Sequence, residues 1–365
     1  MKIILFILYI CTLASINSFH LEIQHLLQKH HIPTSIEYLN NNVILKSTLT
    51  SIHCISAPTK DNNNNINTNN PLLSKSLSNN KDESNIIHLH EDVYYRSKAI
   101  IESRLLAKNN IYQCKEYARK TTVKKIDVIT AYNFLTINHL WGGTKAKYNY
   151  GIYNQNDELI AVASFSPRRN VLRNNQKYRS HELIRFCTKQ GINIIGGISK
   201  LIKKFIKDYQ PDDIITTIDR DFGSSDGWTS SLGFHKVMTH PPLPQVVSIH
   251  GERHPLVGAG LIINNNNNSN NDNNTRSLRR SLPQHIINEL ADIDCPDKVR
   301  ELLSYYNYYC VYDAGVERLM MLVDEPKESI EIDVIDLFRY KSTPSFPINY
   351  YSNNKGISAL LDEVI

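Results

Sequence analysis

The chain has 365 residues, of which 41% are hydrophobic and 21% are charged, and its formal net charge is +5. This length and apolar content are enough for a buried core, and one compact domain with disordered attachments fits best. The excess of basic residues is too small to demand a polyanionic partner, although it permits weak binding to nucleic acid.

Residues 1–18 have the pattern of a signal peptide, with Lys2, an apolar run over Ile3–Cys11 and small residues before Phe19. The stretch is short for a membrane anchor, although an uncleaved anchor is the alternative. The sequence ASINSF also resembles the cleavage signature of bipartite targeting into plastids bounded by extra membranes. We therefore expect entry into the secretory pathway and then a plastid, or otherwise secretion, with no membrane association after signal removal.

Residues 19–92 are rich in Asn, Ser, His and Thr, most strongly over Asp61–Asn70, and we expect a low-complexity transit segment and linker. His88 and His90 lack acidic or cysteine partners nearby in the sequence, which favours solvated histidines over metal ligands. Five cysteines remain beyond the signal and none is in a CxxC pair, so the sequence predicts neither a disulfide framework nor a metal site. This cysteine usage favours a reducing compartment.

A folded domain is expected over residues 93–323. Helical spacing covers Asp92–Lys108 and Ile126–Leu140, and the second helix leads into Trp141. Lys147–Tyr153 and Leu159–Phe165 flank a polar turn and predict an antiparallel hairpin.

A polar, basic loop follows this hairpin. It is the best candidate for contact with a nucleic-acid backbone, and a solvated loop is the alternative. Its cations are Arg168, Arg169, Arg173, Lys177 and Arg179.

The most informative stretch runs from Glu182 to Phe234. Glu182–Thr188 is apolar on both faces and predicts a central strand. After Gly196 and Gly197, apolar and lysine residues alternate at helical spacing up to Pro211. Ile214–Ile218 predicts a second strand, parallel to the first through a right-handed crossover.

The glycine turn has a physical consequence at the carboxyl ends of these strands. A helix that begins at Gly197 directs unpaired N–H groups and a positive dipole end to that edge, where glycine permits close approach of an anion. Asp219 and Arg220 follow the neighbouring strand and should lie at the same edge. The spacing alone is equally compatible with glycines that only make a tight turn.

Beyond Phe234 the sequence predicts a strand at Lys236–Thr239, helical spacing over Gln284–Tyr305 and a final hairpin of Tyr308–Asp313 with Glu317–Val323. An Asn-rich insert covers residues 264–274, at a loop where added length costs little stability. Residues 324–365 are expected to form a tail.

Seven segments of Arg104–Leu322 resemble, in the same order, the domain that follows the nuclease module in phage homing-endonuclease-like proteins. The segments are IYQCKEYARKTTVKKI, FLTINHLWGG, YGIYNQNDELIAVASF, ELIRFC, GGISKLIKKF, IDRDFGSSDGWTSSLGF and YYCVYDAG. That domain and the Mom-like DNA-modification proteins of phages are similar to the GNAT acyltransferase superfamily. The resemblance implies an α/β fold, a GNAT-like mixed central sheet flanked by helices, with a disordered N-terminal extension and the Asn-rich insert.

The resemblance also implies a cofactor, acetyl-CoA or another acyl-CoA, and no metal. The family's pyrophosphate loop has the pattern Q/R-x-x-G-x-G/A, and the corresponding positions here are Asn193 or Ile194 with Gly196, Gly197 and Ser199, to which Lys200 is a further candidate. Thr229 stands where a general-acid tyrosine is often found.

Two functions are therefore open. The first is an acyl-CoA-dependent N-acyltransferase, in which strand N–H groups polarise the thioester and Glu182 or Asp219 takes a proton from the amine. His139 is a further candidate proton acceptor, with helix capping as the alternative. The acceptor amine would belong to a small molecule, a protein or a nucleic acid. The second function is a non-catalytic, nucleic-acid-binding relic that uses the basic loop.

Overall fold

The computed structural model describes residues 18–39, 42–57, 86–173, 176–255, 282–323 and 354–362. The chain forms two compact units. Unit 1 takes its described residues from Met1–Arg96, Pro241–Ala314 and Phe346–Ile365, and unit 2 from Ser97–His240 and Gly315–Ser345. The expected single domain over residues 93–323 is thus replaced by two units that share this range. The signal peptide up to residue 17, the run Asp61–Asn70 and the insert 264–274 lie outside the described residues.

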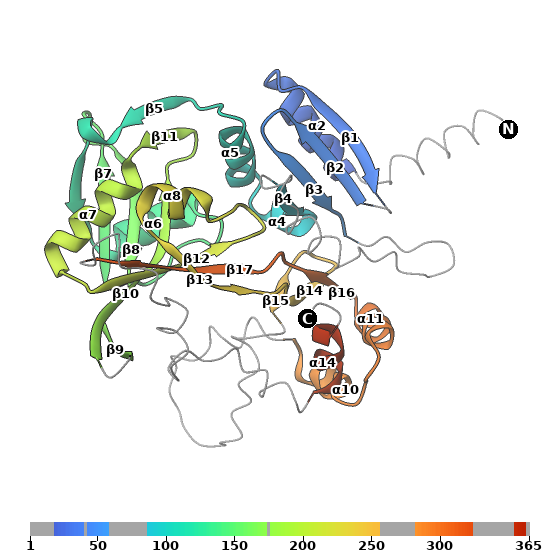
Figure 1. Cartoon of the computed structure of the whole chain (residues 1–365). Coiled ribbons are helices and arrows are strands. Elements are labelled where there is room, and N and C mark those ends of the chain that lie inside the picture. The colour runs from blue at the N-terminus through green and yellow to red at the C-terminus, as the bar shows by residue number, and fades with distance from the viewer. Residues whose placement is uncertain are drawn as a thin grey trace. The chain divides into compact units, whose positions relative to one another are not determined.

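Unit 2 is built on a mixed sheet in the strand order β13-β17-β12-β10-β8-β7-β6, with β9 paired to β10 (Figure 1). Within this sheet, β10 and β12 are parallel and the other pairs are antiparallel. The strands are β6 (Thr122–Lys125), β7 (Tyr148–Tyr153), β8 (Leu159–Phe165), β9 (Arg169–Arg173), β10 (Gln176–Thr188), β12 (Asp213–Asp219), β13 (His235–His240) and β17 (Val316–Leu322).

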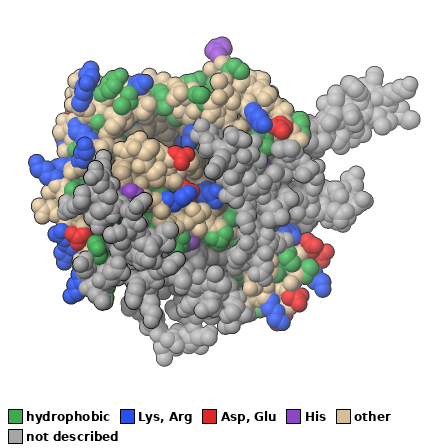
Figure 2. Space-filling model, viewed as in Figure 1, with side chains coloured by type: hydrophobic (Ala, Val, Ile, Leu, Met, Phe, Trp, Pro, Cys, Tyr) green, Lys and Arg blue, Asp and Glu red, His purple; other side chains and the backbone are tan. Residues whose placement is uncertain are grey.

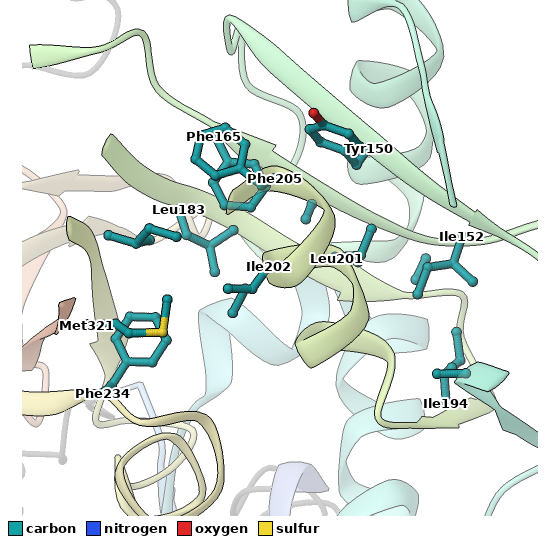
Figure 3. Close-up of a cluster of buried hydrophobic side chains, with 14 of the residues drawn as sticks. Tyr150, Ile152, Phe165, Leu183, Ile194, Leu201, Ile202, Phe205, Phe234 and Met321 are labelled. Atoms are coloured by element: carbon teal, nitrogen blue, oxygen red, sulfur yellow. The ribbon is translucent and has the colours of Figure 1, made fainter. Parts of the chain in front are cut away.

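Two helices bury apolar stripes against the sheet of unit 2. α7 (Gly197–Tyr209) packs Leu201, Ile202 and Phe205 into the main core, where Phe205 stacks on Phe165 with ring centroids 3.9 Å apart (Figure 3). α6 (Val128–Asn138) packs Ala131, Phe134 and Leu135 in a separate cluster with Val162. The expected class, a mixed central sheet flanked by helices, is confirmed.

Shorter elements complete unit 2. α5 (Lys98–Lys108) precedes β5 (Cys114–Tyr117) and the 3-10 turn η2 (Ala118–Lys120). β11 (Ile192–Ile195) pairs in parallel with β5 between the end of β10 and the start of α7. α8 (Asp226–Leu232) ends at Gly233, which has a φ of 78° and so adopts the left-handed conformation that glycine favours.

Unit 1 holds structure where a linker was expected. α2 (Ser18–Lys29) buries Phe19, Ile23 and Leu27 completely, at the i, i+4, i+8 spacing of one helix face. A sheet of β1 (Thr34–Leu39), β2 (Asn42–Ser47), β3 (Ser51–Ile55) and β4 (Ile86–His90) follows, and α4 (Glu91–Arg96) places Tyr94 5.3 Å from Phe19 between ring centroids. Enough apolar surface is buried to order this part of the segment.

The remaining elements of unit 1 are β14 (Pro244–Ser248), β15 (Arg253–Pro255), α10 (Gln284–Leu290), α11 (Pro296–Tyr305), β16 (Tyr308–Tyr312) and α14 (Lys355–Asp362). The predicted hairpin of residues 308–323 is wrong. β16 pairs with β14, whereas β17 lies between β12 and β13 in unit 2. Leu319, Met320 and Met321 of β17 are all buried, so both faces of this strand are covered in unit 2.

His88 and His90 of unit 1 also differ from the expectation of solvated side chains. His53, His88 and His90 lie on the paired strands β3 and β4 and are 1%, 0% and 2% exposed. Nδ1 of His53 and Nδ1 of His88 are 3.1 Å apart, so one ring donates to the other. Burial lowers the pKa of His53 to about 4, which keeps this ring neutral near pH 7.

Candidate functional site

The ladder between β10 and β12 is short. Ser180–Glu182 pair with Asp213–Ile215, and no further pairs join the two strands in the described part of the chain. Thr216 Oγ1 donates to Leu183 O at 3.1 Å, just beyond the last pair. From there β10 continues to Thr188 and β12 to Asp219, and residues 184–188 of β10 lie beyond the last ladder pair with β12. We call this stretch the opening.

A β-bulge in β10 lies at the start of the opening. Leu183 pairs with Phe165 and Arg185 with Ser164, so Ile184 is the additional residue. The bulge changes which face each following side chain occupies. Leu183 and Phe186 pack in the main core, on the face that α7 covers, whereas Cys187 packs in the cluster with α6. Arg185 is two residues before Cys187 and therefore lies on the α6 face as well.

The predicted glycine turn leads directly into α7. Gly196 is the N-cap, with a φ of 76°, and it is exposed. The first hydrogen bond of the helix runs from Lys200 N to Gly196 O, at 3.1 Å. Helix geometry therefore gives the N–H groups of residues 197–199 no acceptor within the helix. Ser199 lies in this first turn and is partly exposed. The turn thus offers donors and a positive dipole end to an anion.

The two glycines have different functions. A Cβ on Gly196 would meet only Ala118 Cβ, at 3.6 Å, whereas a Cβ on Gly197 would lie 2.9 Å from Ile194 Cγ2. Figure 3 shows Ile194 and Ile152 together at the end of the core near which Gly197 begins the helix. Gly197 is therefore required for close packing, and Gly196 is the glycine that an anion can approach.

Two other residues of the predicted phosphate loop have structural partners. Asn193 lies in β11, opposite Lys115 of β5. Lys200 Nζ donates to Ala118 O at 2.7 Å and also to Thr121 O, the backbone at the C-terminal end of η2. Lys200 is thus held at that end, and the N–H groups of the first turn are the donors that remain for a phosphate.

On the α6 face, hydrogen bonds bring three elements to the edge of the sheet at which β10 ends. The turn after β10 is held by Ser103 of α5, whose Oγ accepts from Gly191 N at 3.0 Å, and by Asn138 of α6, whose Oδ1 accepts from Gln190 N at 3.1 Å. α5 also reaches the segment after β12, because Arg104 Cζ lies 4.8 Å from the ring centroid of Phe222. α5 therefore spans from the end of β10 to the end of β12.

His139 follows α6 at this edge and is held as a neutral ring. Its Nδ1 accepts from Trp141 N at 3.1 Å, so the proton of the neutral imidazole is on Nε2. Burial, and then the charges of Arg185 and Arg104, lower the pKa of His139 to about 3. The expected proton acceptor is thus a hydrogen-bond donor, because a second proton is opposed by both cations.

The two predicted carboxylates are at different levels of the sheet. Asp219 ends β12 at the opening, and its Oδ2 accepts from Trp141 Nε1 at 3.2 Å. Glu182 pairs with Ile215, four residues before Asp219, which is about 13 Å along an extended strand. Glu182 is also bonded to Arg169. Asp219 is consequently the carboxylate of this pair that lies at the opening.

The sequence interpretation missed Arg104 and Arg185. Arg185 had a detectable signal, because a charged residue inside the apolar run ELIRFC departs from the composition of a buried strand. Arg104 had none, since it lies more than 70 residues before the start of β10. Beside them, burial raises the pKa of the Cys187 thiol to about 12, so this group is not a thiolate nucleophile near neutral pH.

The basic loop forms a hairpin of β9 with the first half of β10. Arg169 is paired with Glu182, and Arg179 binds Asp212 with Nη2 to Oδ1 at 2.6 Å. Arg169 is opposite Ser180, so it points to one face while Lys177 and Arg179 point to the other. Arg168 is exposed, and Arg173 ends β9. Lys and Arg side chains are spread over the side of the molecule that carries α7 and β9 (Figure 2), without gathering on one face of the hairpin.

Neither a metal site nor a membrane span is evident in the described residues. Within them, no three His, Cys, Asp or Glu side chains are arranged to hold a metal ion. None of the described helices is long and apolar enough to cross a bilayer.

Comparison with known proteins gives matches of low similarity. No family model matches the chain, and no curated protein does. Among solved structures, spermidine/spermine N-acetyltransferase SpeG from Vibrio cholerae, in complex with manganese ions, matches 34% of this chain and 83% of its own, with 10% identity and a TM-score of 0.26. A GNAT family acetyltransferase from Elizabethkingia anophelis with acetyl-CoA bound and an IAA acetyltransferase from Bacillus cereus each match 56% of this chain and 99% of their own, with 10% identity and TM-scores of 0.27. Similarity at this level does not identify an activity.

Proposed function

We propose that unit 2 is an acyl-CoA-dependent N-acyltransferase of GNAT-like fold. The observation that carries the proposal is the opening between β10 and β12, at the carboxyl ends of the strands joined by α7. The extended thiol arm of acyl-CoA lies along the part of β10 that continues beyond its ladder with β12. The pyrophosphate of the same molecule is bound by the first-turn N–H groups of α7, next to the exposed Gly196.

The bulge supports the acyl-transfer step. A bulge turns local N–H groups out of the regular ladder, and here it lies where the thioester carbonyl of a ligand along β10 would be placed. Donors aimed at this oxygen stabilise the charge that develops during acyl transfer.

The chemistry requires one base. The acceptor nitrogen attacks the thioester carbon, its C–N bond forms, the C–S bond breaks and coenzyme A leaves as a thiolate. Asp219 takes the proton released by nitrogen, directly or through water, and solvent protonates the thiolate. Trp141 holds Asp219 in place through the 3.2 Å hydrogen bond from Nε1.

The test is amine-dependent release of coenzyme A. The full chain is incubated with acetyl-CoA and amines from each class of acceptor, namely small molecules, peptides and oligonucleotides. Free thiol is followed with a thiol reagent, and the N-acetyl product is identified by mass spectrometry. We expect release that requires both protein and amine. No amine-dependent release with any of the three classes would overturn the proposal.

We further propose that the signal peptide directs this chain through the secretory pathway to a plastid. The support is the sequence pattern of residues 1–18 and the junction before Phe19. The N-terminal sequence of the mature protein and the position of a full-length fluorescent fusion test this. A fusion that stays in the cytosol with Met1 retained would contradict it.

A further inference from the structure

Arg104, Lys108 and Arg185 bring positive charge to the α6 face of the opening. Arg104 and Lys108 are one helical turn apart on α5, and a Cβ built on Gly223 would lie 3.4 Å from Lys108 Nζ. Both side chains thus point to the segment after β12. Arg185 is on the same face of β10 as Cys187, and its Nη1 donates to Ile184 O at 2.8 Å, at the bulge itself.

His139 adds a donor to these cations. Because Nδ1 accepts from Trp141 N, the ring presents Nε2–H, and its electrostatic partners are Arg185 and Arg104. Asp219 is a nearby carboxylate, whose Oδ2 accepts from Trp141 Nε1 and whose Oδ1 accepts from Asp221 N. Arg104 is exposed, and Arg185 and His139 are partly exposed, so a ligand can reach them.

We infer that the acceptor of this N-acyltransferase is a small amine that carries a carboxylate or a phosphate group, and that Arg104 and Arg185 bind this oxoanion. The inference rests on the proposed function. Guanidinium groups donate paired hydrogen bonds to the oxygens of carboxylate and phosphate, and Arg104 and Arg185 both lie close enough to His139 to oppose its protonation. A polyamine or a simple alkylamine is a cation, so the arginines repel it. An amine that also carries an anionic group is attracted to the arginines through that group.

The test compares amines that differ only in the anionic group. β-Alanine is paired with propylamine, and phosphoethanolamine with ethanolamine, so the two pairs also separate carboxylate from phosphate. The full chain acetylates each amine from acetyl-CoA, and products are quantified by mass spectrometry. We expect the anionic member of at least one pair to have a kcat/KM roughly 10- to 100-fold higher, as loss of a charge-assisted hydrogen bond implies.

Arg104→Gln should abolish this preference, because kcat/KM should fall more for the anionic amine than for its neutral counterpart. Lys207→Gln is the matched control, since it removes one positive charge from the exposed surface of α7 and should leave the preference intact. Equal or faster acetylation of the neutral amines, or of spermidine, by the wild-type chain would overturn the inference while leaving the acyltransferase standing.

Binding of the same amines without acyl-CoA separates the two proposals. Calorimetry should show that β-alanine or phosphoethanolamine binds the wild-type chain and the Lys207→Gln variant, and binds Arg104→Gln weakly or not at all. If this binding is present while no acetyl transfer occurs, the proposed function fails and the assignment of an acceptor fails with it. If transfer occurs and Arg104→Gln leaves both binding and preference unchanged, the acyltransferase stands and the inference does not.

Discussion

Trp141 Nε1 donates to Asp219 Oδ2 at 3.2 Å. This bond joins the segment that follows α6 to the last residue of β12. These residues are 78 positions apart, and the bond fixes the carboxylate at the open end of the β10/β12 ladder. The orientation of the candidate base is thus set by a side chain from the other side of the opening.

Asp219→Asn should reduce turnover without unfolding unit 2, because the side chain no longer takes a proton, while its amide oxygen replaces one of the two acceptor oxygens that bind Trp141 Nε1 and Asp221 N. The kcat for acetyl transfer should fall by about 10²–10⁴, the usual contribution of a general base. Binding of acetyl-CoA should change little. Steady-state kinetics and calorimetry on the same preparation check this, and Glu182→Gln is the comparison. A larger loss of kcat in Glu182→Gln would show that Glu182, and not Asp219, is the general base.

Gly197→Val should destabilise unit 2, since its Cβ would approach Ile194 Cγ2 to 2.9 Å in the core. Overpacking of this kind typically costs about 1–3 kcal/mol. Both tryptophans of the chain, Trp141 and Trp228, are in unit 2, so the denaturant midpoint of their fluorescence measures the effect. An unchanged midpoint would show that the contact relaxes.

Unit 1 depends on a buried ion pair between Arg253 and Asp92, whose side chains are 5% and 2% exposed. Asp92→Ala should cost about 3–5 kcal/mol, because it leaves the guanidinium buried without its counter-charge. Asp297→Ala is the control, as the Asp297 side chain is 86% exposed in its pair with Arg300 and should change stability by at most about 0.5 kcal/mol. Hydrogen exchange of the β4 amides reports on unit 1. Equal exchange in both variants would contradict the prediction.

Unit 1 should also lose stability in acid. The pKa of His53 is lowered from 6.5 to about 4 by burial, so between these values the unfolded chain binds a proton that the folded chain does not. The free energy of unfolding therefore falls as pH decreases from 6.5 to 4.

Hydrogen exchange of the β3 and β4 amides, corrected for the intrinsic rate at each pH, measures this loss. His53→Asn keeps a hydrogen-bonding group near the position of Nδ1, which faces His88, but does not titrate in this range. The variant should lose less stability than the wild type over the same interval. Parallel pH profiles for the two proteins would show that His53 is not responsible.

The sequence was sufficient where the signal is local. Leu201 and Phe205 on one face of the lysine-rich helix, and the two apolar strands around it, identify the β10, α7 and β12 unit. The Phe19, Ile23 and Leu27 stripe was equally local, but the polar composition around it obscured it.

Long-range pairing was beyond the sequence. The end of the β10/β12 ladder at Glu182 and Ile215 depends on register, and the placement of Arg104 beside Phe222 depends on where α5 docks. Neither is encoded by spacing along the chain. The choice of β17 to pair inside unit 2, instead of with β16, likewise depends on burial of Leu319 and Met320 on opposite faces.

Calorimetry of acetyl-CoA binding tests the central claim most directly. Gly196 has a φ of 76°, a conformation that Asn and Asp tolerate better than other side chains, and a Cβ there would make an ordinary contact, 3.6 Å from Ala118 Cβ. Gly196→Asp places a negative charge at the N-terminus of α7, and Gly196→Asn is its uncharged counterpart. We predict that the wild-type chain and Gly196→Asn bind acetyl-CoA and that Gly196→Asp binds at least about tenfold more weakly, through charge repulsion of the pyrophosphate. No binding by the wild-type chain, or equal binding by the two variants, would contradict the acyl-CoA site.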